Sequence, residues 1–192
     1  MTLWFLARAL GFVALLAFTG SVTLGTLARS GSDGRGRTVR QLVHRSLAVT
    51  GLVALLGHLV CIVVDPFVSV GWVAALVPLA SGCRPVAVGL GTLALWAFVL
   101  AAVSGAARGR LATSPRAVAA WRWVHRSAWV GWLLSLGHGL LAGTDTGTPW
   151  AVATYAACAA AVVLAWGATR RGGHPRTTLT DGTRRLTSAG AR

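Results

Sequence analysis

Five long runs of apolar residues divide the chain, and the arginines sit in short clusters between some of them. At about 1.5 Å per residue, a helix over each run reaches about 30 Å, the thickness of the hydrocarbon core of a bilayer. We therefore predict five membrane-spanning helices, over residues 3–28, 41–64, 85–106, 117–141 and 149–167. The first run is too long for a signal peptide and has no basic segment before it, so we expect a retained helix.

The composition favours the same class, an all-α integral membrane protein. Hydrophobic residues make up 55% of the 192 residues and charged residues only 11%, whereas a soluble domain averages about 25% charged residues. A chain with this share of hydrophobic residues cannot be largely disordered, because disorder requires low hydrophobicity. We expect one domain over residues 1–169, a five-helix transmembrane bundle, followed by a basic, disordered tail over residues 170–192.

The net charge of +14 is explained by the positions of the arginines. The loops after the first and third runs and the tail hold sixteen of them, on one side of a five-span bundle, and only Arg8 and Arg84 lie on the other side. The positive-inside rule then places the N-terminus outside and the C-terminus in the cytoplasm of a multi-pass protein of a bacterial-type plasma membrane. No nucleic-acid-binding motif accompanies the charge, so we expect no such partner.

Two further features concern the connection between the second and third runs and the tryptophans near the span ends. The connection over residues 65–84 stays apolar, and it is either a short helix lying in the membrane interface or a cap over something buried at the outer face. Four tryptophans near span ends are typical of interfacial belts: Trp4, Trp121, Trp123 and Trp150.

An internal repeat places four histidines at matched depths. Residues 43–60 read VHRSLAVTGLVALLGHLV, and residues 124–140 read VHRSAWVGWLLSLGHGL. Because one span intervenes, these two spans run in the same direction. His44 and His125 are therefore expected near the inner face, and His58 and His138 in the outer half of the membrane.

Ionisable residues inside a membrane are rare and usually functional. The simpler interpretation is that each histidine hydrogen-bonds a neighbouring helix; the alternative is metal ligation by neutral imidazole. The two histidines of one span are about 20 Å apart, so all four cannot bind one ion. Two imidazoles at each depth suit haem iron with two axial ligands, which predicts two haems. No Cys-x-x-Cys-His motif occurs, so non-covalent haem b is expected.

The spacing of the histidines predicts a distortion in the second of these spans. A step of 14 residues, from His44 to His58, returns within about 40° of one helix face, whereas the 13-residue step from His125 to His138 ends about 140° away. The span over residues 117–141 therefore needs a kink or an over- or underwound turn, and Gly131 and Gly137 offer places for it.

Three arginines are candidates to bind the haem propionates. Arg45 and Arg126 directly follow the inner histidines, and Arg8 lies about one turn inside the first span without an acidic partner in that span. Snorkelling to the headgroups is the alternative for Arg8. For Arg45 and Arg126, the favoured alternative is that they are ordinary positive charges on the cytoplasmic side of the membrane and have no haem contact.

The histidine pattern resembles that of the ferric reductase-like transmembrane domain family. This family includes the membrane cores of ferric reductases and NADPH oxidases and the haem-binding membrane subunit of the bacterial methionine sulfoxide reductase system. The resemblance covers about residues 4–167, and His44, His58, His125 and His138 match the family's haem ligands. Five spans are predicted here, rather than the six common in larger members, so the chain resembles a shortened form of the family's membrane core. No stretch of the chain suits FAD or NADPH.

The resemblance implies an oxidoreductase-type electron-transfer subunit that lacks a flavin or NAD(P)H domain of its own. We expect a membrane b-type cytochrome, acting either as a reductase of a small acceptor at the outer face or as a relay to an exported partner enzyme. Electrons would come from a cytoplasmic flavoprotein, attracted by the arginine-rich loops, or from a membrane quinol. A metal or small-molecule transporter is the remaining alternative. It is disfavoured because Asp65 and Asp145 lie at span ends or in loops, which leaves no carboxylate within the spans.

Overall fold

The computed structural model describes residues 2–28, 34–111 and 113–171, and within these residues every regular element is a helix. Four of the helices are long and apolar enough to cross a membrane: α1 (Thr2–Leu27), α2 (Gly34–Val64), α4 (Pro85–Ala106) and α8 (Pro149–Arg171). They coincide with four of the five predicted runs. An all-α protein with several potential membrane spans is therefore confirmed. Of the predicted tail, Arg170 and Arg171 end α8, and residues 172–192 lie outside the described residues.

The remaining predicted span, over residues 117–141, differs from the prediction because it is broken. It consists of α6 (Pro115–His125) and α7 (Ser127–Ala142), and neither helix alone has the length of a span. At the break, the Arg126 N–H lies 3.1 Å from the Arg122 carbonyl oxygen and 3.2 Å from that of Trp123. The Trp129 N–H bonds the Arg126 carbonyl oxygen at 3.0 Å. Bonds to the third preceding residue mark a tightened, 3₁₀-like turn.

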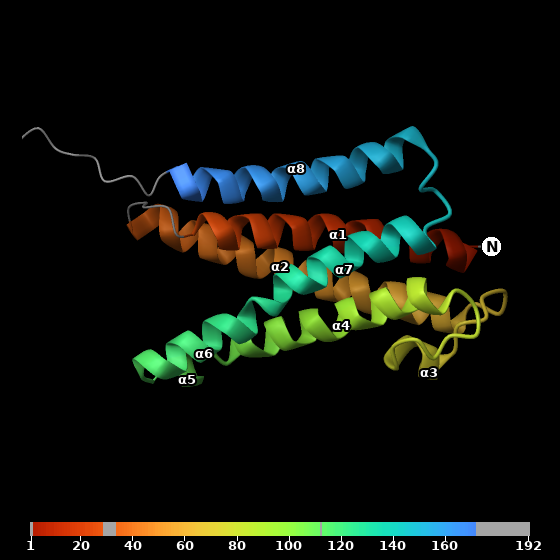
Figure 1. The fold of residues 1–192 in the computed structure, drawn as a ribbon, viewed down its shortest axis with the longest axis horizontal. Coiled ribbons are helices and arrows are strands. Elements are labelled where there is room, and N and C mark those ends of the chain that lie inside the picture. Colours follow the sequence, from red (N-terminus) through yellow and green to blue (C-terminus); the bar gives the residue numbers. More distant parts are fainter. Residues whose placement is uncertain (1, 29–33, 112, 172–192) are drawn as a thin grey trace, which may run out of the picture.

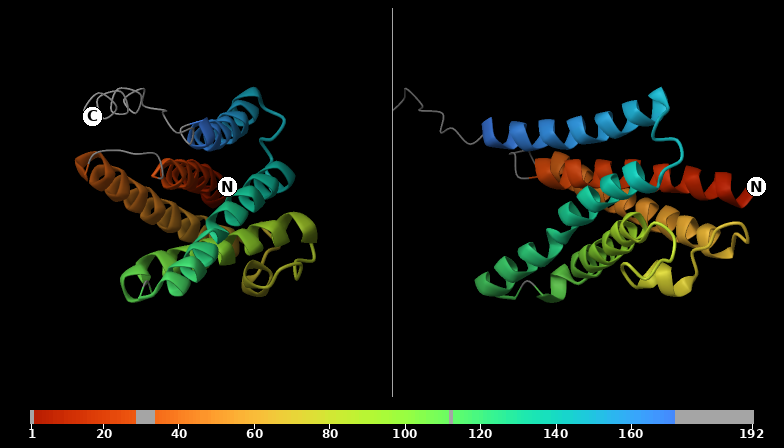
Figure 2. Two further views of the ribbon diagram at one scale, coloured as in Figure 1. Left: turned by 60° about the vertical axis from the view of Figure 1, so that its left-hand side comes forward. Right: turned by 45° about the vertical axis from the view of Figure 1, so that its right-hand side comes forward.

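The helices form two closely packed antiparallel pairs, α1 with α2 and α4 with α7 (Figure 1). Helix α8 lies along α1, and α7 crosses between α1 and α4 (Figures 1 and 2). The short helix α3 (Trp72–Leu76) lies against α4, near the end of the bundle that holds the N-terminus. At the other end, α5 (Arg108–Leu111) and α6 carry many of the arginines.

The two antiparallel pairs repeat one packing arrangement. An added Cβ at Gly51 would meet the Phe18 ring, and one at Gly131 would meet the Phe98 ring. Likewise, Gly57 faces Leu10 and Gly137 faces Leu90. Gly131 and Gly137 therefore allow α4 to approach α7 closely, and the distortion that the sequence predicts in this span occurs at Arg126 instead.

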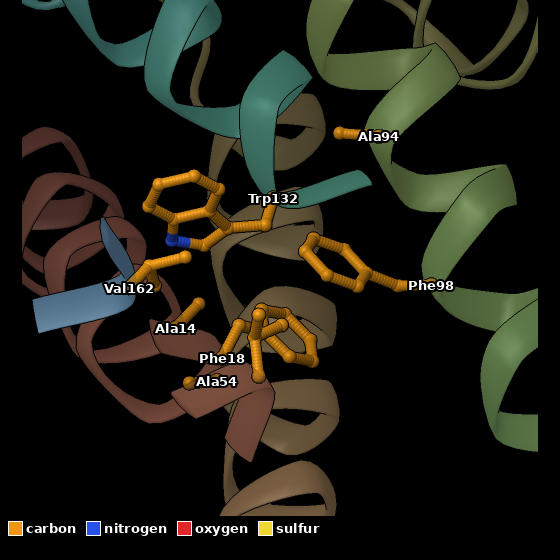
Figure 3. Close-up of a cluster of buried hydrophobic side chains, with 8 residues drawn as sticks. Ala14, Phe18, Ala54, Ala94, Phe98, Trp132 and Val162 are labelled. Carbon is orange, nitrogen blue, oxygen red and sulfur yellow. The ribbon is translucent and has the colours of Figure 1, made fainter. Parts of the chain in front are cut away.

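The core of the bundle lies where the two pairs meet (Figure 3). Phe18 from α1 and Phe98 from α4 stack with ring centroids 3.7 Å apart and planes inclined by 9°. Trp132 from α7 closes one side, and its indole N–H donates to the Thr19 hydroxyl at 3.0 Å. The other buried members are small or aliphatic: Ala14, Val22, Ala54, Ala94 and Val162.

The connection over residues 65–84 is partly helical and packs on α4. It contains the short helix α3, in which Trp72 is 54% and Val73 69% exposed. It is also fixed to α4, because the Trp96 indole N–H donates to the Leu76 carbonyl oxygen at 2.9 Å. The Thr92 hydroxyl donates to the carbonyl oxygen of Ala74 at 3.3 Å. The segment thus covers one end of α4.

Candidate functional site

The four span histidines meet in two pairs. The ring centroids of His44 and His125 lie 6.3 Å apart, and those of His58 and His138 lie 6.2 Å apart. In each pair α2 supplies one ring and the broken helix α6–α7 the other. The ring planes are inclined by 68° in the first pair and by 83° in the second. This is the pairing that the matched depths in the sequence predict, and the tightened turn at Arg126 lies between the two histidines of its segment.

Each imidazole is held by a backbone carbonyl of the neighbouring helix. The Nδ1 atoms of His44 and His58 lie 2.8 Å and 2.7 Å from the carbonyl oxygens of Ser21 and Ala7 on α1. Those of His125 and His138 lie 2.9 Å and 2.7 Å from the carbonyl oxygens of Ala101 and Ala87 on α4. A carbonyl oxygen only accepts, so Nδ1 carries the hydrogen and Nε2 keeps its lone pair. Metal-ligating histidines are oriented in the same way.

A glycine lies against each imidazole, four residues after the residue whose carbonyl holds it. An added Cβ at Gly11 or Gly25 on α1 would lie 3.2 Å from His58 or 3.3 Å from His44. On α4, an added Cβ at Gly91 would lie 2.7 Å from His138, and one at Gly105 would lie 3.1 Å from His125. Real Cβ atoms rarely come this close to a neighbour. The missing side chains therefore allow each ring to lie directly on the helix that holds it.

A cavity of about 420 Å³ adjoins the His58–His138 pair. The two histidines line it together with the stacked rings of Phe18 and Phe98. Residues 67–70, from the connection that covers one end of α4, also line it. This position agrees with one of the two interpretations left open for the connection, a cap over a buried site.

Two arginines line the same cavity. The Arg8 guanidinium forms an ion pair with Asp145, which lies in the connection between α7 and α8, so its acidic partner comes from outside its own span. The Nε of Arg8 is buried and has no hydrogen-bond partner among the residues that the structure describes. Arg84, which sequence analysis placed on this side without giving it a role, lines the cavity from the start of α4. Its φ of 49° lies in the left-handed region.

The other two arginine candidates lie near the His44–His125 pair, on the surface. Arg45 and Arg126 are both exposed. The Arg126 guanidinium lies over the Trp123 ring, 4.8 Å from its centroid. Neither residue lines the cavity beside His58 and His138.

Trp121, which the sequence places in an interfacial belt, also belongs to this site. Its ring stacks on the imidazole of His125, with centroids 5.3 Å apart and planes inclined by 14°. The position of Trp121 one helical turn before His125 is the signal in the sequence that could have identified this contact.

The donor set fits haem better than a metal ion held by protein ligands alone. Within the described residues, no group of three or more His, Cys, Asp or Glu side chains could hold a metal. Cys61 and Cys158 are buried free thiols, and Cys83 is an exposed one. Two free Nε2 atoms per pair suit a metal whose other ligands come with a cofactor. The cavity, and a buried Arg8 Nε without a partner, suit a flat group that carries carboxylates.

No family model, curated protein or solved structure matches this chain. The functional assignment therefore depends on the geometry of the two histidine pairs.

Proposed function

We propose that this chain is the core of a membrane b-type cytochrome, with one haem held by His44 and His125 and a second by His58 and His138. The observation that carries the proposal is the spacing of the paired rings, 6.3 Å and 6.2 Å between centroids. A metal bonded at about 2.0 Å to one nitrogen of each imidazole holds the two centroids about 6 Å apart. When bound, haem iron with two axial imidazoles supplies a one-electron couple between its ferric and ferrous states.

The surrounding residues have separate roles in this proposal. The carbonyl oxygens of α1 and α4 hold Nδ1 of each ring, which leaves Nε2 as the atom that would bind a metal. The stacked pair of Phe18 and Phe98 fills the space between the two sites with apolar atoms. The Arg8 Nε and Arg84 offer donors to propionates beside His58 and His138. Arg45 and Arg126 have the same role beside His44 and His125.

The distribution of arginine supports the orientation in this proposal. In the proposal, α6 and α7 together form a fifth span, the N-terminus lies outside, and the arginine-rich end lies in the cytoplasm. A cytoplasmic flavoprotein or a membrane quinol supplies electrons, and an acceptor receives them at the outer face. The chain is then an oxidoreductase-type subunit, and its resemblance to the ferric reductase-like family is part of the same proposal.

The test is a dithionite-reduced minus oxidised spectrum of the purified protein, with the haem content quantified. We expect a b-type spectrum of iron with two imidazole ligands. His58→Ala and His138→Ala should each lose the haem of that pair and keep the other haem. The matched control is His174→Ala, which changes the remaining histidine and should keep both haems; His174 lies outside the described residues. A protein without a b-type signal contradicts the proposal.

The electron donor is tested by stopped-flow reduction of the reconstituted protein. A flavoprotein that docks on the arginine-rich end should reduce the haems more slowly after Arg110→Gln and Arg116→Gln, with a dependence on ionic strength. Rapid reduction by quinol, at a rate that these substitutions leave unchanged, identifies the quinol as the donor instead.

A further inference from the structure

The His125 imidazole belongs to a stack of side chains that is fixed at several points. The Trp121 ring lies on the imidazole at 5.3 Å and 14°. The indole N–H of Trp121 donates to the Ser104 carbonyl oxygen at 2.8 Å. The Ser104 hydroxyl, in turn, lies 3.3 Å from Nδ1 of His125. The Arg108 guanidinium lies over the Trp121 ring, 5.1 Å from its centroid. Ser104 is buried and Trp121 half-buried.

In the described part of the chain, His125 is the one histidine of the repeat with such a stack. His125 in the second pair of helices corresponds to His44 in the first, and Trp121 then corresponds to Arg40. Arg40 donates from its guanidinium to the Leu27 carbonyl oxygen at 2.9 Å. Within the described residues, the ring contacts of His44, His58 and His138 are those with their partner histidines. The aromatic contact therefore distinguishes His125 from the other three histidines of the repeat.

A stacked ring supplies a restraint that the hydrogen bond does not. The bond from Nδ1 of His125 to the Ala101 carbonyl oxygen limits rotation of the imidazole about its Cβ–Cγ bond, but hydrogen bonds tolerate a range of angles, so the ring plane can still tilt. Contact with the flat face of an indole, itself held by Ser104, opposes this turning because tilting the imidazole would drive its edge into the indole. The planes of His125 and His44 are inclined by 68°, against 83° in the other pair.

We propose that Trp121 is a positioning residue of the His44–His125 pair, which fixes the plane of the His125 imidazole and so sets the relative orientation of the two ligands. The proposal rests on the proposed function in treating the two imidazoles as ligands. The relative orientation of axial imidazole planes governs the magnetic anisotropy of ferric low-spin haem, and ligand geometry is one of the protein's means of tuning the iron.

The first experiment needs no bound haem. Full-length protein with ¹³C-labelled histidine, purified in detergent without haem, is compared by NMR with the Trp121→Leu and Trp121→Phe variants. We expect the ring current of Trp121 to move the His125 side-chain resonances upfield, Trp121→Leu to abolish this shift and Trp121→Phe to retain part of it. Trp123→Leu is the matched control, because Trp123 is 71% exposed and lies under Arg126. The same His125 resonances in the wild type and in Trp121→Leu overturn the proposal.

The second experiment uses the haem-loaded protein with His58→Ala, so that only the His44–His125 haem contributes. In its electron paramagnetic resonance spectrum, Trp121→Leu should shift the largest g value and broaden the signal at an unchanged haem content. Trp121→Phe should restore most of the wild-type signal. Trp72→Leu, at an exposed tryptophan of α3, should leave the signal unchanged. An unchanged signal in Trp121→Leu overturns the positioning role. A wild-type protein that binds no haem overturns the proposed function, and the NMR comparison then decides on Trp121 alone.

Discussion

Replacing Gly91 by alanine is predicted to weaken haem binding at the His58–His138 pair. The added Cβ would lie 2.7 Å from Nδ1, 2.8 Å from Cε1 and 3.1 Å from Cγ of His138. An ordinary contact begins at 3.4 Å, so the ring must move by about 0.7 Å. Since Nδ1 is held at 2.7 Å from the Ala87 carbonyl oxygen, this movement disrupts that hydrogen bond.

The magnitude follows from two contributions, which arise when the His138 ring returns to its ligand position. Overpacking against the added Cβ costs about 1–3 kcal/mol, and the weakened hydrogen bond about 0.5–1.5 kcal/mol. Alanine's higher helix propensity in α4 is the same with and without haem, so it does not change the affinity. A loss of about 1.5–4.5 kcal/mol corresponds to at least roughly tenfold weaker haem binding.

The assay is a haem titration of the purified apoprotein in detergent, in a His125→Ala background that retains only the His58–His138 site. The matched control is Gly167→Ala in α8, where an added Cβ meets nothing within 4 Å. That variant should bind haem as tightly as the background protein. If Gly91→Ala also keeps the background affinity, the close contact between helix and imidazole has no part in ligand positioning and the reasoning is refuted.

Three further predictions concern the ligand planes, Arg8 and the orientation of the chain. Because the imidazole planes are inclined by 68° and 83°, both ferric haems should give highly anisotropic low-spin electron paramagnetic resonance signals; rhombic signals, typical of parallel planes, contradict this geometry. Arg8→Gln removes a charged donor beside His58 and His138, so it should weaken haem binding at that site roughly tenfold and leave the other site unchanged. Haem titration measures both sites, and equal losses at the two argue against a local contact. Cys83 is exposed, whereas Cys61 and Cys158 are buried, so a membrane-impermeant thiol reagent should label intact cells at Cys83; labelling only after permeabilisation reverses the proposed orientation.

The sequence predicts the long helices well because an uninterrupted apolar run is a strong signal in one dimension. The break at Arg126 is harder to place. The 13-residue spacing between His125 and His138 requires a distortion somewhere in the span, but glycine content pointed to Gly131 and Gly137. The distortion lies instead at Arg126, beside His125, and the two glycines lie in close contact with α4.

The pairing of the histidines could be predicted from their depths, whereas the groups that hold them could not. Nδ1 is bound by backbone carbonyls, which every residue has, so no residue type marks the positions. The facing glycines did carry a signal: Gly11 and Gly25, like Gly91 and Gly105, have the 14-residue spacing of His44 and His58. Hydropathy does not distinguish them from the many other small residues of the spans.

The acidic partner of Arg8 illustrates a contact that periodicity cannot supply. Asp145 is 137 residues away in the sequence and lies in the connection between α7 and α8. Its position depends on how α8 returns along α1, which is set by tertiary packing. Sequence analysis correctly found no acid within the first span, but the ion pair forms between separate elements.

The central claim, that each haem is shared by one histidine of α2 and one of α6–α7, is tested most directly by haem stoichiometry in double variants. Replacing both members of a pair, His44 with His125 or His58 with His138, should leave the other site intact, so we expect about one haem per chain. Replacing one member of each pair, as in His44→Ala with His138→Ala, should remove both haems. The account is contradicted if such a mixed variant keeps a full haem, or if a paired variant loses both while the apoprotein remains folded.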